Sequence, residues 1–155
     1  MSAIKSFLLA IDVATRKRDQ ANQNLGHAHN AYLFAQNQMS QLETYAAETE
    51  ARWTASAQVS TTPELMRHHY QFMARLQQAV GMQQGVLEAE HQKVEAARKI
   101  VLDAEFRLIS LNQVLEKKLA DQAVLLARRE QKQMDEFAAM QSAKSDGGHF
   151  SGERS

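Results

Sequence analysis

The segment from residue 73 to residue 115 decides the fold, and its sequence is MARLQQAVGMQQGVLEAEHQKVEAARKIVLDAEFRLISLNQVL. Every seventh residue in it is apolar: Met73, Val80, Leu87, Val94, Val101, Leu108 and Leu115. A companion row contains Leu76, Ala97, Ala104 and Leu111, and is interrupted at Gln83 and Glu90. A period of 3.5 residues sustained over several heptads indicates a coiled-coil helix.

The N-terminal part of the chain carries the same repeat. One row contains Ile4, Ile11, Arg18, Leu25, Tyr32, Met39, Ala46 and Trp53, and the row three residues further on contains Phe7, Ala14, Ala21, Ala28, Ala35, Leu42 and Thr49. Only Arg18 and Thr49 are not apolar. The many alanines predict close helix packing with little area buried per turn, so this helix needs a partner to be stable.

The boundary between the two repeats lies just before the only proline in the chain. Thr62 is a suitable N-cap, Pro63 fits the first helical position, and Glu64 faces the positive end of the helix dipole. A short connection between two long helices forces them to pack antiparallel. We therefore predict an all-α fold, a long antiparallel two-helix coiled-coil hairpin over residues 1–142, with helices at about 3–57 and 63–141 and a turn at about 58–62.

The second predicted helix is longer than the first, at roughly 115 Å against roughly 80 Å. About twenty of its residues should extend beyond the first helix, an overhang of roughly 30 Å. The apolar rows change phase by four residues after Leu115, which is a stutter. The overhang carries Leu126, Met134 and Phe137, which would need another protein to cover them. Residues 143–155 are glycine- and serine-rich and predict a disordered tail.

Composition excludes several classes of protein. The 155 residues contain no cysteine, so there is no disulfide framework and no cysteine-ligated metal. Eighteen basic and eighteen acidic residues give a net charge of zero, which argues against nucleic-acid binding. No apolar stretch is long enough for membrane insertion or a signal peptide, so we expect a cytoplasmic protein.

Residue patterns for chemistry are weak. Glu88 and His91 match one half of a di-iron motif, but a second half is missing, and we expect the six histidines to be solvated rather than metal ligands. The glycines Gly81 and Gly85 predict a soft spot in the second helix. No nucleophile elbow, phosphate loop or catalytic carboxylate pair is present. We therefore expect no enzymatic activity, no cofactor and no metal.

Two groups of residues suggest protein contacts instead. Basic residues cluster at Arg16-Lys17-Arg18, Lys117-Lys118 and Arg128-Arg129, in the half away from the turn, each offset by nearby acids. A solvated surface and a docking face both remain possible interpretations of these clusters. Aromatic residues concentrate in the half that contains the turn: Tyr32, Phe34, Tyr45, Trp53, Tyr70 and Phe72. Packing in the coiled coil explains some of them, and exposed aromatics such as Phe34 and Phe72 indicate a binding surface.

Residues 70–80 read YQFMARLQQAV, and residues 129–138 read REQKQMDEFA. Both segments resemble the FliJ family of the bacterial flagellar type III export apparatus, which typically carries EQK-x-MDEFA at the second segment. Together with the length and the hairpin, the resemblance covers residues 1 to about 142. It implies a fold like the central stalk of rotary ATPases, and a non-enzymatic role in flagellum biogenesis, protein export, chemotaxis and motility.

The resemblance also implies partners. Family members insert their open end into the hexameric export ATPase, promote its ring assembly and couple it to the export gate, whose cytosolic domain they contact. They also escort export chaperones, and the regulator of the ATPase is a further implied partner. This implies a cytoplasmic protein peripherally associated with the inner face of the cell membrane, without direct membrane insertion or nucleic-acid binding. The expected ATPase-docking set is Arg16, Lys17, Arg18, Lys117, Lys118, Arg128, Arg129, Met134 and Phe137. The expected gate patch is Gln38, Leu42, Tyr45, Phe72, Leu76 and Ala79, with Thr49 and Gln83 departing from the family pattern at its edges.

Three alternatives stay open at this stage. The aromatic face would also suit a coiled-coil chaperone or holdase for export substrates. A stalk of a virulence type III secretion system would share the fold, although the C-terminal motif is of the flagellar type. A scaffolding coiled coil would dimerise through the overhang, and sedimentation would reveal it.

Overall fold

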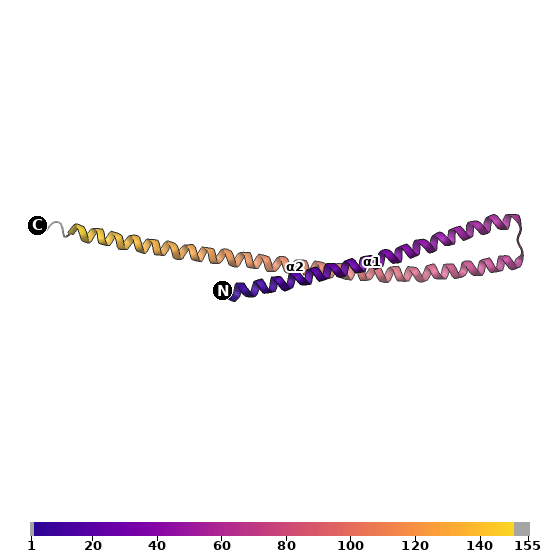
Figure 1. The fold of residues 1–155 in the computed structure, drawn as a ribbon, viewed down its shortest axis with the longest axis horizontal. Helices are drawn as coiled ribbons and strands as arrows, with labels where there is room; N and C mark the ends of the chain where they lie inside the picture. Colours follow the sequence, from indigo (N-terminus) through magenta and orange to yellow (C-terminus); the bar gives the residue numbers. More distant parts are fainter. Residues whose placement is uncertain (1, 151–155) are drawn as a thin grey trace. The chain divides into compact units, whose positions relative to one another are not determined.

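The computed structural model describes residues 2–150, and these form two helices and no strand. α1 spans Ser2–Val59 and α2 spans Pro63–Phe150, with 58 and 88 residues respectively. The helices pack against each other as a hairpin (Figure 1), which confirms the predicted fold class and the longer second helix. The chain divides into two compact units: residues 13–107, and the N-terminal residues to 12 together with those from 108 onward.

The turn between the helices forms as its residues predict. Thr62 accepts a hydrogen bond at its Oγ1 from the backbone N–H of Leu65, at 3.2 Å, and at its carbonyl oxygen from that of Met66, at 3.0 Å. Pro63 is the first helical residue, where its missing N–H removes no helical hydrogen bond. The N–H of Ser60 donates to the carbonyl oxygen of Ser56 at 3.1 Å, closing the last turn of α1. The connection is therefore 60–62, shorter than the predicted 58–62.

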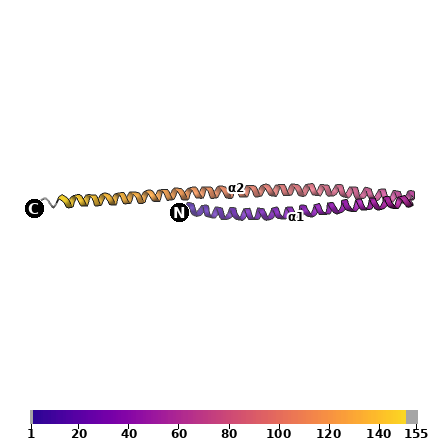
Figure 2. The ribbon, with the colours of Figure 1, turned by 90° about the horizontal axis from the view of Figure 1, so that it is seen from above.

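In the unit of residues 13–107, α1 and α2 run antiparallel and side by side, as two perpendicular views show (Figures 1 and 2). All predicted seam positions in this unit are buried or half-buried. The most buried apolar residues here are Ala14, Ala21, Ala35, Met39, Leu76, Val94 and Val101. No large side chain is fully enclosed among the described residues, because a two-helix contact covers each side chain from one side only.

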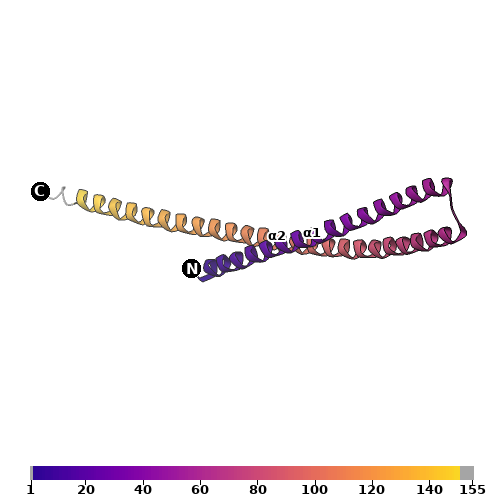
Figure 3. The ribbon, with the colours of Figure 1, turned by 45° about the vertical axis from the view of Figure 1, so that its right-hand side comes forward.

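The second unit pairs the start of α1 with α2 from residue 108. Leu108 is buried, while Ile4, Phe7 and Leu115 are half-buried. From residue 119 to residue 146 every side chain of α2 is exposed, and within this unit Figure 3 shows no other helix beside this stretch. The prediction of an overhang without an intramolecular partner is therefore confirmed for these residues.

The C-terminal part of α2 departs from expectation. The predicted helix ends near 141 and is followed by a disordered tail over 143–155, whereas α2 continues to Phe150. Ala143 and Lys144 in this stretch are good helix formers, the other non-glycine residues cost at most about 0.7 kcal/mol each, and each glycine costs about 1 kcal/mol in a helix interior. No described glycine adopts the positive φ that ends many helices. Residues 151–155 of the predicted tail lie outside the described residues.

Candidate protein-docking surfaces

The expected gate patch lies within the unit of residues 13–107. Tyr45 on α1 and Phe72 on α2 meet edge to face, with ring centroids 6.2 Å apart and an interplanar angle of 83°. Both rings are exposed, whereas Leu76 beneath them is buried and Leu42 is half-buried. The patch therefore presents two exposed aromatic rings together with a buried and a half-buried leucine, and aromatic side chains are enriched at protein interfaces.

Gln83 borders this patch and links the two helices. Its Nε2 donates to the carbonyl oxygen of Ala35 at 2.9 Å and lies 3.4 Å from Oε1 of Gln38. A hollow beside the patch is lined by Gln38, Gln41, Leu42, Tyr45 and Gln83. At the other edge, the hydroxyl oxygen of Thr49 is buried without a hydrogen-bond partner. The two residues that depart from the family pattern therefore differ in hydrogen bonding: the side-chain amide of Gln83 has partners, whereas the buried hydroxyl of Thr49 has none.

His69 forms a cluster that sequence analysis missed. Its ring stacks on Trp53, with centroids 4.4 Å apart and planes 10° from parallel, and its Nε2 lies 3.1 Å from Oε2 of Glu50. His69 is buried, so the expectation that the histidines are solvated is wrong for this one. The companion row of α2, extended one heptad back from Leu76, reaches His69, and that spacing was the signal available in the sequence.

The basic residues of the ATPase-docking set fall into both units, and each unit is described by itself. In residues 13–107, Arg16 and Lys17 are exposed, and Arg18 is half-buried. Arg18 Nη2 lies 2.9 Å from Oδ1 of Asp19, so the guanidinium of this seam residue reaches the surface. This ion pair contributes little stability because it is solvated.

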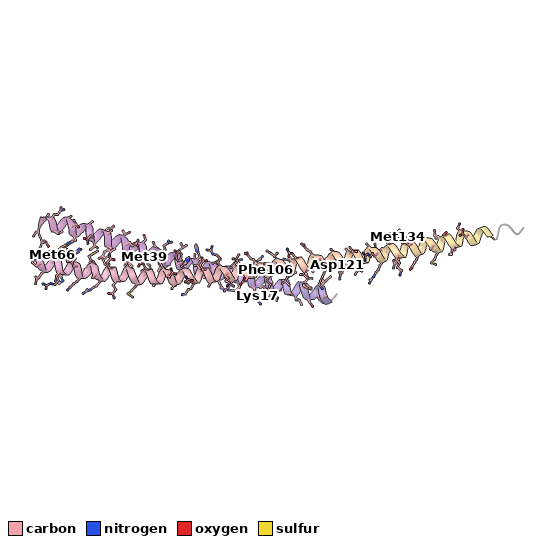
Figure 4. The ribbon with its side chains drawn as sticks, turned by 180° about the vertical axis from the view of Figure 1, so that it is seen from behind. Lys17, Met39, Met66, Phe106, Asp121 and Met134 are labelled. Atoms are coloured by element: carbon pink, nitrogen blue, oxygen red, sulfur yellow. The ribbon has the colours of Figure 1, made fainter. Side chains whose placement is uncertain are left out.

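In the other unit, Lys117, Arg128 and Arg129 are exposed, but Lys118 is half-buried. Its Nζ lies 5.0 Å from the centroid of the Phe7 ring, a cation–π contact that joins α2 to the start of α1. Met134 and Phe137 are 69% and 63% exposed, and Figure 4 shows Met134 on the stretch of α2 that has no helix beside it. Lys118 therefore has a structural contact that the rest of the set lacks in this unit.

Other kinds of site are absent from the described part of the chain. Among the side chains of residues 3–146, no group of three or more His, Asp or Glu lies together so that it could hold a metal ion. No described helix has a segment long and apolar enough to span a bilayer. Three hollows along the described part of the hairpin are open grooves lined by residues of both α1 and α2. All three carry polar side chains, and two of them also carry aromatic ones.

These features define a class: an antiparallel coiled-coil hairpin whose exposed aromatic and cationic surfaces suit protein docking. Residues 5–147 match the family of flagellar FliJ proteins, and the chain belongs to that family. It is therefore a component of the flagellar protein-export apparatus, within a family of non-catalytic export components that serve protein transport and motility. No curated protein and no solved structure matches the chain.

Proposed function

We propose that this chain is the central stalk of the flagellar export ATPase. It binds the hexameric ATPase through the exposed end of α2, promotes ring assembly and couples the ring to the export gate. The observation that carries this proposal is the bare stretch of α2 over residues 119–146, every side chain of which is exposed. Seven large apolar residues lie uncovered there, and a partner that buried them would gain hydrophobic free energy: Leu119, Val124, Leu125, Leu126, Met134, Phe137 and Met140.

The chemistry of this stretch suits a ring-shaped partner. Arginines and aromatic residues dominate binding energy at interfaces, and Arg128, Arg129 and Phe137 supply both types. A ligand that contacts several subunits of a closed ring binds the ring more tightly than it binds the separate subunits. By mass action such a ligand shifts the equilibrium toward the assembled ring. Among the basic residues, Arg16, Lys17, Arg18 and Lys117 complete the proposed docking set, and Lys118 contributes less because Phe7 already holds it.

The gate patch is proposed as the contact with the cytosolic domain of the export-gate protein. Tyr45 and Phe72 would be its anchors, since both are exposed while they are held in place by their edge-to-face contact. Gln38, Leu42, Leu76 and Ala79 surround them. Two rings that are already ordered lose less conformational entropy on binding than flexible side chains do.

Escort of export chaperones completes the proposed role. The chain would act in the cytoplasm, peripherally associated with the inner face of the cell membrane at the flagellar base, without catalytic activity of its own. The ATPase regulator and the export chaperones are its further proposed partners.

The decisive experiment measures the ATPase rate of the cognate export ATPase with and without the chain. We expect stimulation by the full chain, and its loss, by about tenfold or more at limiting concentration, in the variant R128E/R129E/F137A. The control variant K93E/K99E changes the charge by the same amount on the exposed surface of residues 13–107. No stimulation by the full chain, under conditions in which the ATPase forms rings, would refute the stalk mechanism.

A holdase for export substrates is the second candidate, and it is favoured by two exposed rings outside the gate patch, Phe34 and Tyr70. Suppression of aggregation of an unfolded export substrate, lost in F34A/Y70A while ATPase stimulation persists, would support it. A virulence-type stalk would instead stimulate the ATPase of a virulence system more strongly than that of the flagellar system.

A further inference from the structure

A second groove lies on the same face of the hairpin as the gate patch, and of its lining residues only Lys17 belongs to a surface proposed above. It encloses about 410 Å³ between α1 and α2, within residues 13–107. Its lining residues are Lys17, Gln20, Ala21, Asn24, Ile100, Asp103, Ala104 and Arg107, and we call it the alanine groove. Lys17 precedes Tyr45 by four heptads and Ile100 follows Phe72 by four, so both pairs occupy equivalent positions on their helices.

The groove exists because its floor is made of small residues. Ala21 is buried and Ala104 is half-buried, and neither side chain extends beyond its Cβ. At the gate patch, the positions four heptads from Ala21 and Ala104 are Thr49 and Leu76, both of which have larger side chains than alanine. Alanine at a helix–helix seam lets another backbone approach closely, as small residues generally do at packed helices. The groove therefore has room for a side-chain row of a third helix.

One wall of the groove is apolar, and the rim of the groove is charged. Ile100 is 59% exposed, although an isoleucine at this flank of a coiled coil gains free energy from burial. Lys17, Asp103 and Arg107 are exposed, and none makes an ion pair or hydrogen bond with another residue in the described part of the chain. The rim thus carries two cations and one anion that are free to pair with a ligand. Figure 4 shows Lys17 on α1 alongside the Phe106 region of α2.

We propose that the alanine groove docks one amphipathic helix of another protein, with small or aliphatic residues along its buried stripe and net acidic flanks. The stripe would lie on Ala21, Ala104 and Ile100, as an amphipathic helix lies in an apolar groove. Acidic side chains on its flanks would pair with Lys17 and Arg107. Packing of a third helix against two antiparallel ones also buries the seam from its open side, which the thin alanine-rich contact leaves partly accessible.

Nucleic acid does not fit this groove, because two cations beside an Asp103 carboxylate neutralise few phosphates. An extended peptide does not fit either, since both helices have satisfied backbones and offer no strand edge for pairing. A helical partner with acidic flanks satisfies both the apolar floor and the charged rim.

The test uses the full chain and two fluorescein-labelled synthetic helical peptides, identical except for their flanks. Both carry leucine and alanine along one stripe; one has glutamate flanks and the other lysine flanks. We expect the unmodified chain to bind the acidic peptide saturably, as measured by fluorescence anisotropy. The variant K17E/R107E should bind this peptide with an affinity at least tenfold lower. We also expect I100A to weaken binding severalfold, and K17E/R107E to bind the lysine peptide better than the unmodified chain does.

The matched control is K93E/K99E, which makes the same charge change in the same unit at exposed residues that do not line the groove. An equal loss of affinity in this control would show that the net charge of the protein, and not the groove, determines peptide binding, and it would overturn the proposal. Absence of saturable binding of the acidic peptide would overturn it as well. Helicity and unfolding midpoints of all variants, measured by circular dichroism, confirm that the hairpin is intact.

Sedimentation equilibrium tests in parallel whether a second copy of the chain occupies the alanine groove. Self-association that K17E/R107E abolishes would assign the groove to a homotypic contact and overturn the proposal of a separate partner. The proposal does not depend on the stalk role, although Lys17 belongs to both proposed surfaces. The variant R128E/R129E/F137A separates them, because it should lose ATPase stimulation and keep full affinity for the acidic peptide.

Discussion

The paired segment of residues 13–107 and the bare stretch of residues 119–146 contain similar apolar residues, but these are buried in the first and exposed in the second. Leu76 is 8% exposed, whereas Leu126 is 57% exposed. The two valines show the same contrast, since Val94 is buried and Val124 is exposed. Both stretches are helical, apart from the connection at 60–62 in the paired segment. Apolar residues on a helix are therefore buried only where a second helix covers them, and the uncovered ones mark where a partner would bind.

Truncating matched leucines would test this comparison most strongly. L76A should lower the free energy of unfolding by about 2–4 kcal/mol, because it removes a buried side chain and leaves a cavity. L126A should change it by less than about 0.5 kcal/mol, as exposed substitutions generally do. Urea unfolding followed by circular dichroism at 222 nm measures both.

Equal losses in the two leucine variants would contradict the comparison, since they would mean that residues 119–146 are covered in solution. A concentration-dependent loss in L126A alone would point to self-association through the bare stretch. Sedimentation of the two variants at several concentrations would separate these outcomes.

The fold was largely predictable because the heptad repeat of a coiled coil identifies, in the sequence alone, which residues lie at the helix–helix contact. Each seam residue from Ile4 to Trp53 is buried or half-buried, and the cap at Thr62 forms as its chemistry requires. The end of α2 was not predictable in the same way. Polar residues near 141–150 neither favour a partner nor forbid a helix, so no strong local signal marks where it stops.

The candidate surfaces were only partly predictable. Exposure of Tyr45 and Phe72 follows from their positions flanking the seam, but the contact between them depends on the register between the helices. The alanine groove was missed because it arises from what is absent, namely side-chain volume at Ala21 and Ala104. His69 was missed because a histidine in an apolar row looks like an interruption until its stacking partner Trp53 is located.

Replacing His69 would sharpen the comparison near the turn. H69A removes the stacking on Trp53 and the hydrogen bond to Glu50, and should lower the free energy of unfolding by about 1–2 kcal/mol. The neighbouring H68A is the matched control, because His68 is exposed and should have an effect below about 0.5 kcal/mol. Trp53 is the only tryptophan, so its fluorescence reports the change directly.

An unchanged Trp53 emission and an unchanged stability in H69A would show that the stacked pair is not formed in solution. A comparable loss in H68A would contradict the assignment to the stacked pair, because His68 is exposed and alanine is the better helix former, so H68A alone should cost no stability.

The smallest expected effect is a gain in stability at the paired segment's two glycines. Nothing lies within 4 Å of a Cβ placed at Gly81 or Gly85, and neither has a positive φ. Alanine at each should therefore stabilise α2 by roughly 0.5–1 kcal/mol, because glycine loses more backbone entropy on folding. G81A/G85A should raise the urea midpoint without changing the slope of unfolding. A loss of stability would mean that a partner or a second backbone approaches α2 at these glycines. Retained ATPase stimulation in the stabilised variant would show that this flexible point in α2 is not required for the proposed stalk.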